Sequence, residues 1–256
     1  MNVLVCVKRV PMTGGRIALT EDARAIDTRF LGFTVSPHEE CAVEEAVRLV
    51  EARGGSSVVL TLGPPEAEEQ LRDAMAIGAD RAVLLETDEP EWDPQATARA
   101  IARAVADLEA SGGPFDLLLF GNESADAGNY QVGVRVAHAL GRPCVTGVKA
   151  LEVHDGRATV RREAVGGWEV FEVPLPAALA VREGLNLPRF PSVPGRLRAK
   201  KKPVERIVVE PERGGLEMVS LELPRGAAKQ VEVLGRGPEA APRVVEILRT
   251  MGLVAR

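Results

Sequence analysis

A loop rich in glycine, asparagine and serine holds the residues whose types and spacing most clearly suggest chemistry. It has the sequence GNESADAGNYQVG, residues 121–133, and it follows the apolar run FDLLLFG and leads into the amphipathic run YQVGVRVAHALG. Backbone N–H groups at the start of a helix attract anions, and glycines let a ligand approach the backbone closely. The loop therefore predicts a site for a phosphate or a nucleotide, although an ordinary turn between a strand and a helix would use the same residue types.

Patterns that would indicate catalysis do not accompany this loop. It contains neither GxxxxGK[ST] nor GxGxxG, so neither the P-loop nor the dinucleotide fingerprint applies. The three histidines, His38, His138 and His154, lie in different settings, and no nucleophile can be assigned to them from loop positions. Three cysteines without a CxxC spacing predict neither a disulfide framework nor a zinc site. We expect no catalytic residue and no metal site.

An alternation of apolar and amphipathic runs must position the loop. Strands are predicted at 2–7, 56–63, 81–87 and 115–121, with helices at 36–53, 64–80, 93–113 and 130–141 and an irregular segment over 8–35. The clearest helix start has Ser36 as N-cap, Pro37 at the first position and Glu39 completing a capping box. This rhythm predicts an α/β fold with a doubly wound, mostly parallel, Rossmann-like sheet, in which ligands bind beyond the strands 2–7 and 115–121.

The rhythm changes after Gly141. Alternating runs around an Asp155-Gly156 turn predict an antiparallel addition over 145–181, at or beside the edge of the sheet. From Pro203 the chain is rich in proline, glycine and glutamate until the short amphipathic run PRVVEILRTMGLV. We therefore expect an α/β nucleotide-binding domain over 1–202 and an extended C-terminal arm over 203–256 that packs on another chain.

Composition limits the class of protein. The 256 residues include 45% hydrophobic and 27% charged residues, with a net charge of −5 and few aromatic residues. No apolar run is long enough to cross a bilayer, and the first residues do not form a signal peptide. These features predict a cytoplasmic protein that neither inserts into membranes nor binds nucleic acid.

The segment LNLPRFPSVPGRLRAKKKPVE, residues 185–205, does not fit a strand or a long helix. It combines four prolines, one phenylalanine and six basic residues in a chain that is acidic as a whole. A local basic cluster can attract an acidic partner, and it can also be no more than a solvated helix end.

Together these pieces resemble the β subunit of electron transfer flavoprotein over about residues 1–205. The resemblance is carried by VCVKRVP, AVEEAVRL, AMAIGADRA, the 121–133 loop and the LNLPRFPSVPGRLRAKKKP block, in that order and spacing. It implies an electron-carrier subunit, not an enzyme, that pairs with an α subunit holding most of the FAD. It further implies electrons accepted from acyl-CoA and related dehydrogenases, as in fatty acid oxidation, and passed to a quinone oxidoreductase.

The resemblance also implies a buried AMP that is structural and not redox-active. Two positions that approach the flavin in the family hold Thr13 and His38 here, and His38 could polarise the flavin by hydrogen bonding or charge. The implied AMP-binding residues are Cys6, Ser36, Pro37, His38, Glu39, Leu62, Gly121, Asn122, Glu123, Ser124, Ala125, Asp126, Ala127, Gly128, Asn129, Tyr130, Gln131 and Val132.

In the family the segment after the last strand, here about 185–202, is a recognition loop that docks on flavin-bearing dehydrogenases. The matching aliphatic anchor is Val193, held between Pro191 and Pro194. Prolines limit the entropy lost on docking, and a basic block adds long-range attraction. The predicted basic residues are Lys200, Lys201 and Lys202.

Two alternatives remain. The loop ends in QVG where many members have polar residues, which is more similar to relatives that hold a second FAD in this site for electron bifurcation. A stand-alone domain that hydrolyses nucleotides or senses adenylate could have the same fold.

Overall fold

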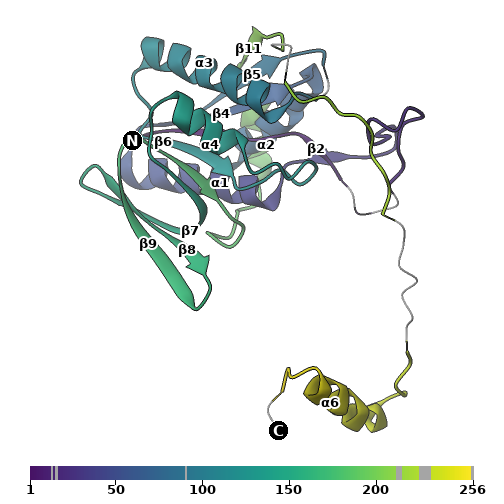
Figure 1. Ribbon diagram of the computed structural model, residues 1–256. Helices are drawn as coiled ribbons and strands as arrows, with labels where there is room; N and C mark the ends of the chain where they lie inside the picture. Colours follow the sequence, from purple (N-terminus) through teal and green to yellow (C-terminus); the bar gives the residue numbers. More distant parts are fainter. Residues whose placement is uncertain (13, 15–16, 90, 212–214, 225–231, 255–256) are drawn as a thin grey trace.

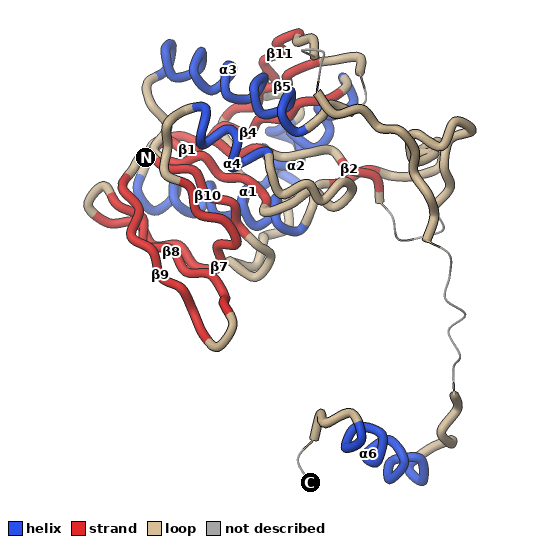
Figure 2. The backbone as a smooth tube through the Cα atoms, viewed as in Figure 1, coloured by secondary structure: helices blue, strands red, loops and turns tan. Residues whose placement is uncertain are grey.

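The computed structural model describes residues 1–254 except 13, 15–16, 90, 212–214 and 225–231. Its described part contains a nine-stranded sheet with the strand order β11-β5-β4-β1-β6-β10-β7-β8-β9 (Figures 1 and 2). Neighbours from β11 to β7 pair in parallel, and β7, β8 and β9 pair antiparallel. A short antiparallel pair, β2 with β3, lies outside this sheet.

The strand bounds follow the predicted alternation over the first half of the chain. The strands are β1 (Asn2–Cys6), β2 (Val10–Pro11), β3 (Phe33–Thr34), β4 (Ser56–Gly63), β5 (Arg81–Glu86), β6 (Leu117–Gly121), β7 (Cys144–His154), β8 (Arg157–Ala164), β9 (Gly167–Pro174), β10 (Ala177–Val181) and β11 (Val204–Val208).

Helices cover both faces of the sheet. The helical segments are α1 (Pro37–Arg53), η1 (Pro65–Ala67), α2 (Glu68–Ile77), α3 (Pro94–Gly112), α4 (Val132–Ala139), α5 (Val193–Ala199), η2 (Pro238–Ala240) and α6 (Ala241–Thr250). Buried residues of α1 and α2 pack with Val3, Val5 and Leu119 on one face. Those of α3 and α4 pack with Leu4 and Phe120 on the other. The strands β1 and β6 are therefore buried on both sides, as their unbroken apolar runs predict.

Local signals at the helix starts behave as expected. The Ser36 hydroxyl accepts a hydrogen bond from the Glu39 N–H at 3.2 Å, and the Glu39 carboxylate accepts one from the Ser36 N–H at 2.8 Å, so the predicted capping box is confirmed. Asp93 caps α3 by accepting from the N–H groups of Gln95 and Ala96. At the β7–β8 turn Asp155 and Gly156 both have positive φ, as a type I′ hairpin turn requires.

Three expectations about the sheet need correction. The run at 177–181 is not part of the antiparallel addition: β10 is fully buried and lies parallel between β6 and β7. The segment 8–35 is not wholly irregular, because it contains β2 and β3. The sheet also continues past residue 202, since β11 at 204–208 pairs with β5 at the opposite edge.

The order of the strands creates a switch point next to β1. From β1 the chain runs outward through β4 and β5, and it then returns to place β6 on the other side of β1. The predicted neighbours 2–7 and 115–121 therefore pair in parallel, with Cys6 beside Phe120. Loops that follow these two strands meet at one edge, where α/β sheets bind ligands.

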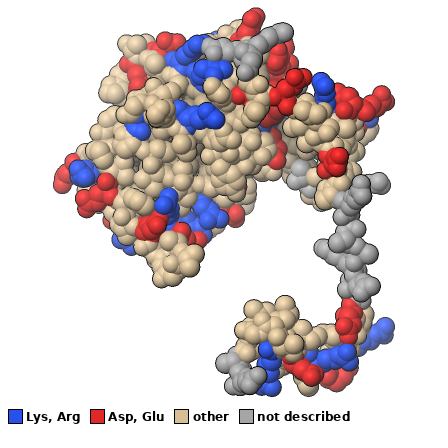
Figure 3. Space-filling model, in the orientation of Figure 1, with Lys and Arg blue, Asp and Glu red and all other residues tan. Residues whose placement is uncertain are grey.

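The C-terminal helix α6 lies apart from the sheet in Figure 1 and has no buried residue. Its uncharged and charged side chains gather on different sides of the helix (Figure 3). The exposed apolar residues in and after it are Val244, Val245, Ile247, Met251, Leu253 and Val254. Among the residues that the structure describes, no helix is both long and apolar enough to span a bilayer.

Candidate functional site

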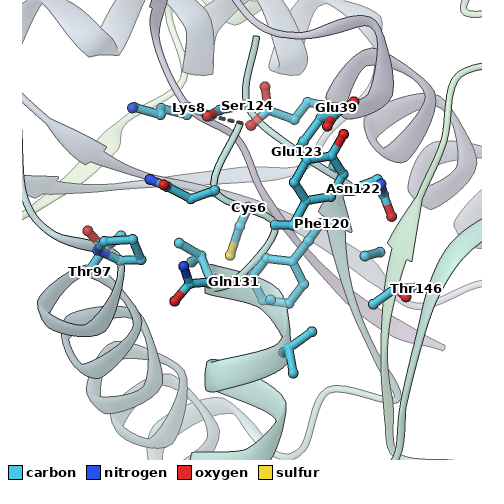
Figure 4. A pocket seen from close by; sticks show the side chains of 18 of the residues that line it. Cys6, Lys8, Glu39, Thr97, Phe120, Asn122, Glu123, Ser124, Gln131 and Thr146 are labelled. Carbon is cyan, nitrogen blue, oxygen red and sulfur yellow. Dashed lines mark hydrogen bonds between the residues drawn. The ribbon is translucent and has the colours of Figure 1, made fainter. Parts of the chain in front are cut away.

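A cavity of about 420 Å³ opens at the switch point beyond β1 and β6. Figure 4 shows Cys6 and Phe120 in its middle, with Thr97 of α3 and Thr146 of β7 on opposite sides. The predicted binding residues that line it are Cys6, Glu39, Leu62, Gly121, Asn122, Glu123, Ser124, Asn129, Tyr130, Gln131 and Val132. The structure thus brings together segments that are more than 100 residues apart.

Other predicted residues lie around the cavity without lining it. Ser36 and Pro37 begin α1, and Asp126 forms an ion pair with Lys8 at 2.7 Å. Ala125, Ala127 and Gly128 belong to the loop but do not form the cavity wall. Thr13 lies outside the described residues.

The wall contains residues that sequence reasoning missed. The segment between β5 and α3 contributes Glu91 and Trp92, and the first turns of α3 contribute Thr97. Strand β8 contributes Arg162, and Arg182 directly follows β10. The indole Nε1 of Trp92 is buried without a hydrogen-bond partner in the described part of the structure. In the sequence, the available sign of this part of the wall is the Glu91-Trp92 pair, which directly precedes the Asp93 helix cap.

Helix α4 turns its first residues to the cavity. Its N-cap residue, Gln131, makes no side-chain capping bond, and Val132, Gly133 and Val134 all line the wall. The first N–H groups of a helix lack partners within the helix, so they can donate to an anion. Phosphate binding at this end of the loop is therefore physically supported.

Lys8 forms a charged network at the cavity wall. Its Nζ lies 2.8 Å from a carboxylate oxygen of Glu91 and 2.7 Å from one of Asp126. Burial alone would lower the pKa of Lys8, but the two carboxylates outweigh it and raise that pKa. Lys8 therefore carries a positive charge that is largely neutralised before any ligand binds.

Glu39 joins α1 to β1 beneath the cavity. One carboxylate oxygen accepts from the Ser36 N–H and the other from the Lys8 N–H, each at 2.8 Å. Burial raises the pKa of Glu39 to about 7, and these hydrogen bonds oppose part of that rise. Gly121 makes this contact possible, because a Cβ there would lie 2.6 Å from the Glu39 Cγ.

Cys6 is not poised for thiol chemistry. It is buried at the end of β1, and burial together with the nearby Glu39 raises the pKa of its thiol far above the ordinary value. Because the thiolate is the reactive form, the thiol contributes an apolar wall and not a nucleophile.

A second candidate site follows β10. We call residues 182–202 the docking segment; it contains the predicted recognition loop and the helix α5. Four of its apolar side chains are strongly exposed, with Phe190 at 96% and Val193 at 72% beside Leu187 and Leu197. Val193 is the first residue of α5, and Ser192 caps that helix. Phe190 is the one phenylalanine of this block, and it is the most exposed of the four.

Charged contacts hold the docking segment on α1. The buried carboxylate of Glu44 accepts from the Arg189 N–H at 3.1 Å and from the Arg189 guanidinium. The same guanidinium pairs with Glu51, and Asn186 donates to Glu45 at 2.9 Å. Burial would raise the pKa of Glu44, but Arg189 and Arg48 outweigh it and lower that pKa.

The end of the docking segment packs on α2. The Lys202 Nζ donates to the Ala79 carbonyl at 2.7 Å, and Arg72 donates to the Ala199 carbonyl at the same distance. Lys200 and Lys201 are exposed, so the three predicted lysines are not equivalent. Lys202 fixes the segment to the domain, while Lys200 and Lys201 face solvent.

Comparisons with known proteins identify the family of this chain. A family model described as the electron transfer flavoprotein domain matches residues 26–212. The electron transfer flavoprotein subunit beta of Bacillus subtilis (strain 168) is 34% identical and covers 98% of this chain and of its own length. That of Syntrophomonas wolfei is 35% identical over 97% of this chain and 96% of its own. The chain belongs to the electron transfer flavoprotein family, among relatives named as its β subunit.

Membership confirms the predicted family, its α/β fold and its role as an electron carrier. A third relative, the caffeyl-CoA reductase-Etf complex subunit CarD of Acetobacterium woodii, is 34% identical over 84% of this chain and 83% of its own. Relatives from different electron-transfer systems therefore share most of this chain's length.

The raised pKa of Glu39 predicts a pH-dependent stability. Its pKa is about 7 in the folded protein against 4.5 for the ordinary side chain, so the folded state holds the proton over that interval. As pH rises through this interval, the free energy of unfolding should fall by on the order of 3 kcal/mol relative to Glu39→Gln. Chemical denaturation across the interval measures it, and parallel curves for the two proteins would contradict the assignment.

Close packing at Gly195 predicts that Gly195→Ala displaces α5. A Cβ at this position would lie 2.5 Å from the Ala76 carbonyl oxygen of α2. We expect a loss of about 1–3 kcal/mol in the free energy of unfolding and weaker docking. The matched control is Gly112→Ala, where a Cβ meets nothing within 4 Å and stability should not fall. Equal stability of the two variants would show that α5 is not held by this contact.

Proposed function

We propose that the chain is the β subunit of a heterodimeric, cytoplasmic electron transfer flavoprotein that binds a structural AMP in the switch-point cavity. The observation that carries this proposal is the cavity itself, which the 121–133 loop and the uncapped start of α4 line together. The N–H groups of the loop and of α4 would hold the phosphate, and Leu62, Phe120 and Val132 would contact the base. AMP has no redox chemistry of its own, so its role there is to fill and order the site.

The FAD that carries the electrons would be shared with an α subunit. In the family two β-subunit positions approach that flavin, but His38 has both ring nitrogens engaged, with the Glu183 N–H and with Glu123. Hydrogen bonding from His38 to the flavin is therefore disfavoured. The His38 ring would contact the flavin through its carbon edge or its face instead. When bound, the FAD supplies the electron-carrying group, and the chain supplies its orientation and the docking surface.

The docking segment would bring in the electron donors, which we propose to be acyl-CoA and related dehydrogenases. Val193 offers a small aliphatic tip on a helix start that is already ordered, which limits the entropy lost on binding. The exposed Arg198, Lys200 and Lys201 favour a partner with an acidic rim. A quinone oxidoreductase would then accept the electrons.

We assign the segment after β11 to contact with the α subunit. The Leu221 N–H donates to the Ala23 carbonyl at 2.6 Å, so part of the segment lies on the 17–32 region of this chain. The apolar side of α6 is covered by nothing in the described part of this chain and would pack on the partner.

A second candidate function is a bifurcating flavoprotein subunit with FAD in place of AMP. The QVG end of the loop and the similarity to CarD favour it. A stand-alone domain that hydrolyses nucleotides is the third reading, and the docking segment held on α1 speaks against it.

Nucleotide analysis separates these candidates. The heterodimer, purified with its α subunit and extracted with acid, should release FAD and AMP in equal amounts. Two FAD and no AMP would establish the bifurcating alternative. A stable monomer of this chain that turns over ATP would contradict both flavoprotein readings.

Substitutions in the docking segment should separate contact from steering. Val193→Ala removes about two methylene equivalents from the tip, so dehydrogenase binding should weaken roughly tenfold with FAD content unchanged. Stopped-flow reduction by the dehydrogenase measures the effect. Unaltered docking by this variant would show that the anchor lies elsewhere, with Phe190→Ala as the next test.

Charge reversal at Lys200 and Lys201 tests whether these lysines steer the partner to the docking segment. The double variant Lys200→Glu, Lys201→Glu should slow association roughly tenfold at low salt and much less at high salt. Lys202→Met should lower stability instead, because its ammonium donates to the Ala79 carbonyl and holds the segment on the domain. The same salt dependence in all three proteins would rule out steering by Lys200 and Lys201.

A further inference from the structure

Helix α1 touches the docking segment along most of its length. His38 in its first turn accepts from the Glu183 N–H, Cys41 and Glu45 in its middle bind Asn186, and Glu44 and Glu51 hold Arg189. The same helix begins at the cavity, where Glu39 is part of the wall. One rigid element therefore contacts both candidate sites.

The His38 side chain contacts residues of both candidate sites, the cavity and the docking segment. Its Nδ1 accepts from the Glu183 N–H at 2.7 Å, and its Nε2 lies 3.2 Å from a carboxylate oxygen of Glu123. Because a backbone N–H can only donate, Nδ1 must be the unprotonated nitrogen. The proton is then on Nε2, which donates to Glu123.

The two partners of His38 belong to segments that are distant in sequence. Glu123 lines the cavity between Asn122 and Ser124, and Glu183 is the second residue of the docking segment. The imidazole is only 14% exposed, although the Glu183 end of its second bond lies at the surface. The backbone N–H of Asn122, the residue before Glu123, donates to the Val181 carbonyl. This bond joins the ends of β6 and β10 independently of the His38 side chain.

We propose that His38 is a positioning residue that couples nucleotide binding in the cavity to the placement of the docking segment. The inference rests on the proposed function, in which the loop binds AMP and the segment binds a dehydrogenase. A ligand held by Asn122 and Ser124 selects the loop conformation in which Glu123 reaches Nε2. That bond orients the ring so that Nδ1 meets the Glu183 N–H and orders the base of the docking segment.

Coupling of this kind is reciprocal. If AMP strengthens dehydrogenase binding by some factor, the dehydrogenase must strengthen AMP binding by the same factor. A histidine that only filled space would change the stability of both segments without linking them. The linkage, and not the stability, is therefore the quantity to measure.

Two variants each remove one of the two bonds. In His38→Asn the side-chain oxygen takes the place of Nδ1, which keeps the bond from Glu183 and loses Glu123. In His38→Gln the amide reaches the place of Nε2, which keeps Glu123 and loses Glu183. Both should abolish the coupling, although they disturb different sites.

Amide hydrogen exchange of the heterodimer, stripped of nucleotide and then given FAD with or without AMP, tests the proposal. In the wild type AMP should slow exchange in both 121–132 and 183–192, by roughly five- to tenfold in the latter. In His38→Asn and His38→Gln the loop should still respond to AMP while 183–192 does not.

The two segments keep the possible failures apart. Protection of 121–132 without any response of 183–192 in the wild type would overturn the coupling and leave the proposed function intact. An equal response of 183–192 in the wild type and in both variants would show that the coupling bypasses His38. No response of the loop to AMP would overturn the proposed adenylate site, and the coupling with it.

Discussion

The buried carboxylate of Glu44 is the constraint on which the arrangement of this molecule depends. It is 1% exposed, and a carboxylate in that position is tolerated only with charged partners close by. Arg48 of the same helix and Arg189 of the docking segment supply those charges. Because Arg189 both covers this carboxylate and pairs with it, the segment cannot leave α1 without the loss of those hydrogen bonds and of the ion pair. An exposed, apolar docking tip is thus presented by a backbone that is fixed beneath it.

The same helix explains why the cavity and the docking segment are neighbours. Its capping box places Glu39 against the first residues after β1, and Gly121 allows β6 to end within contact of that side chain. Further along, Glu44, Glu45 and Glu51 face the segment that follows β10. The acidic pairs of α1 therefore serve two different contacts, one in the cavity wall and one on the surface. One rigid helix therefore supports both the cavity wall and the docking segment.

Local signals in the sequence predicted much of this structure. The Ser36–Glu39 capping box, the Asp93 cap, the Asp155-Gly156 turn and the β1–β6 switch point follow from short-range patterns or from the alternation of strands and helices. What could not be predicted depends on long-range pairing. β10 reads like the hairpin strands beside it, and only tertiary packing places it in the parallel sheet. The partners of His38 are 85 and 145 residues away, and Glu44 reads as a solvated helix charge until Arg189 is seen beside it.

The most direct test of this account is amide exchange over 183–192 in the heterodimer carrying Glu44→Gln. The amide keeps the shape and can still accept from the Arg189 N–H, but it removes the charge that both arginines neutralise. If the buried carboxylate holds the docking segment, exchange there should speed up by at least about tenfold, while residues 121–132 keep their protection and FAD is retained. Unchanged exchange over 183–192 would contradict the account, because the segment would then be held by something other than Glu44.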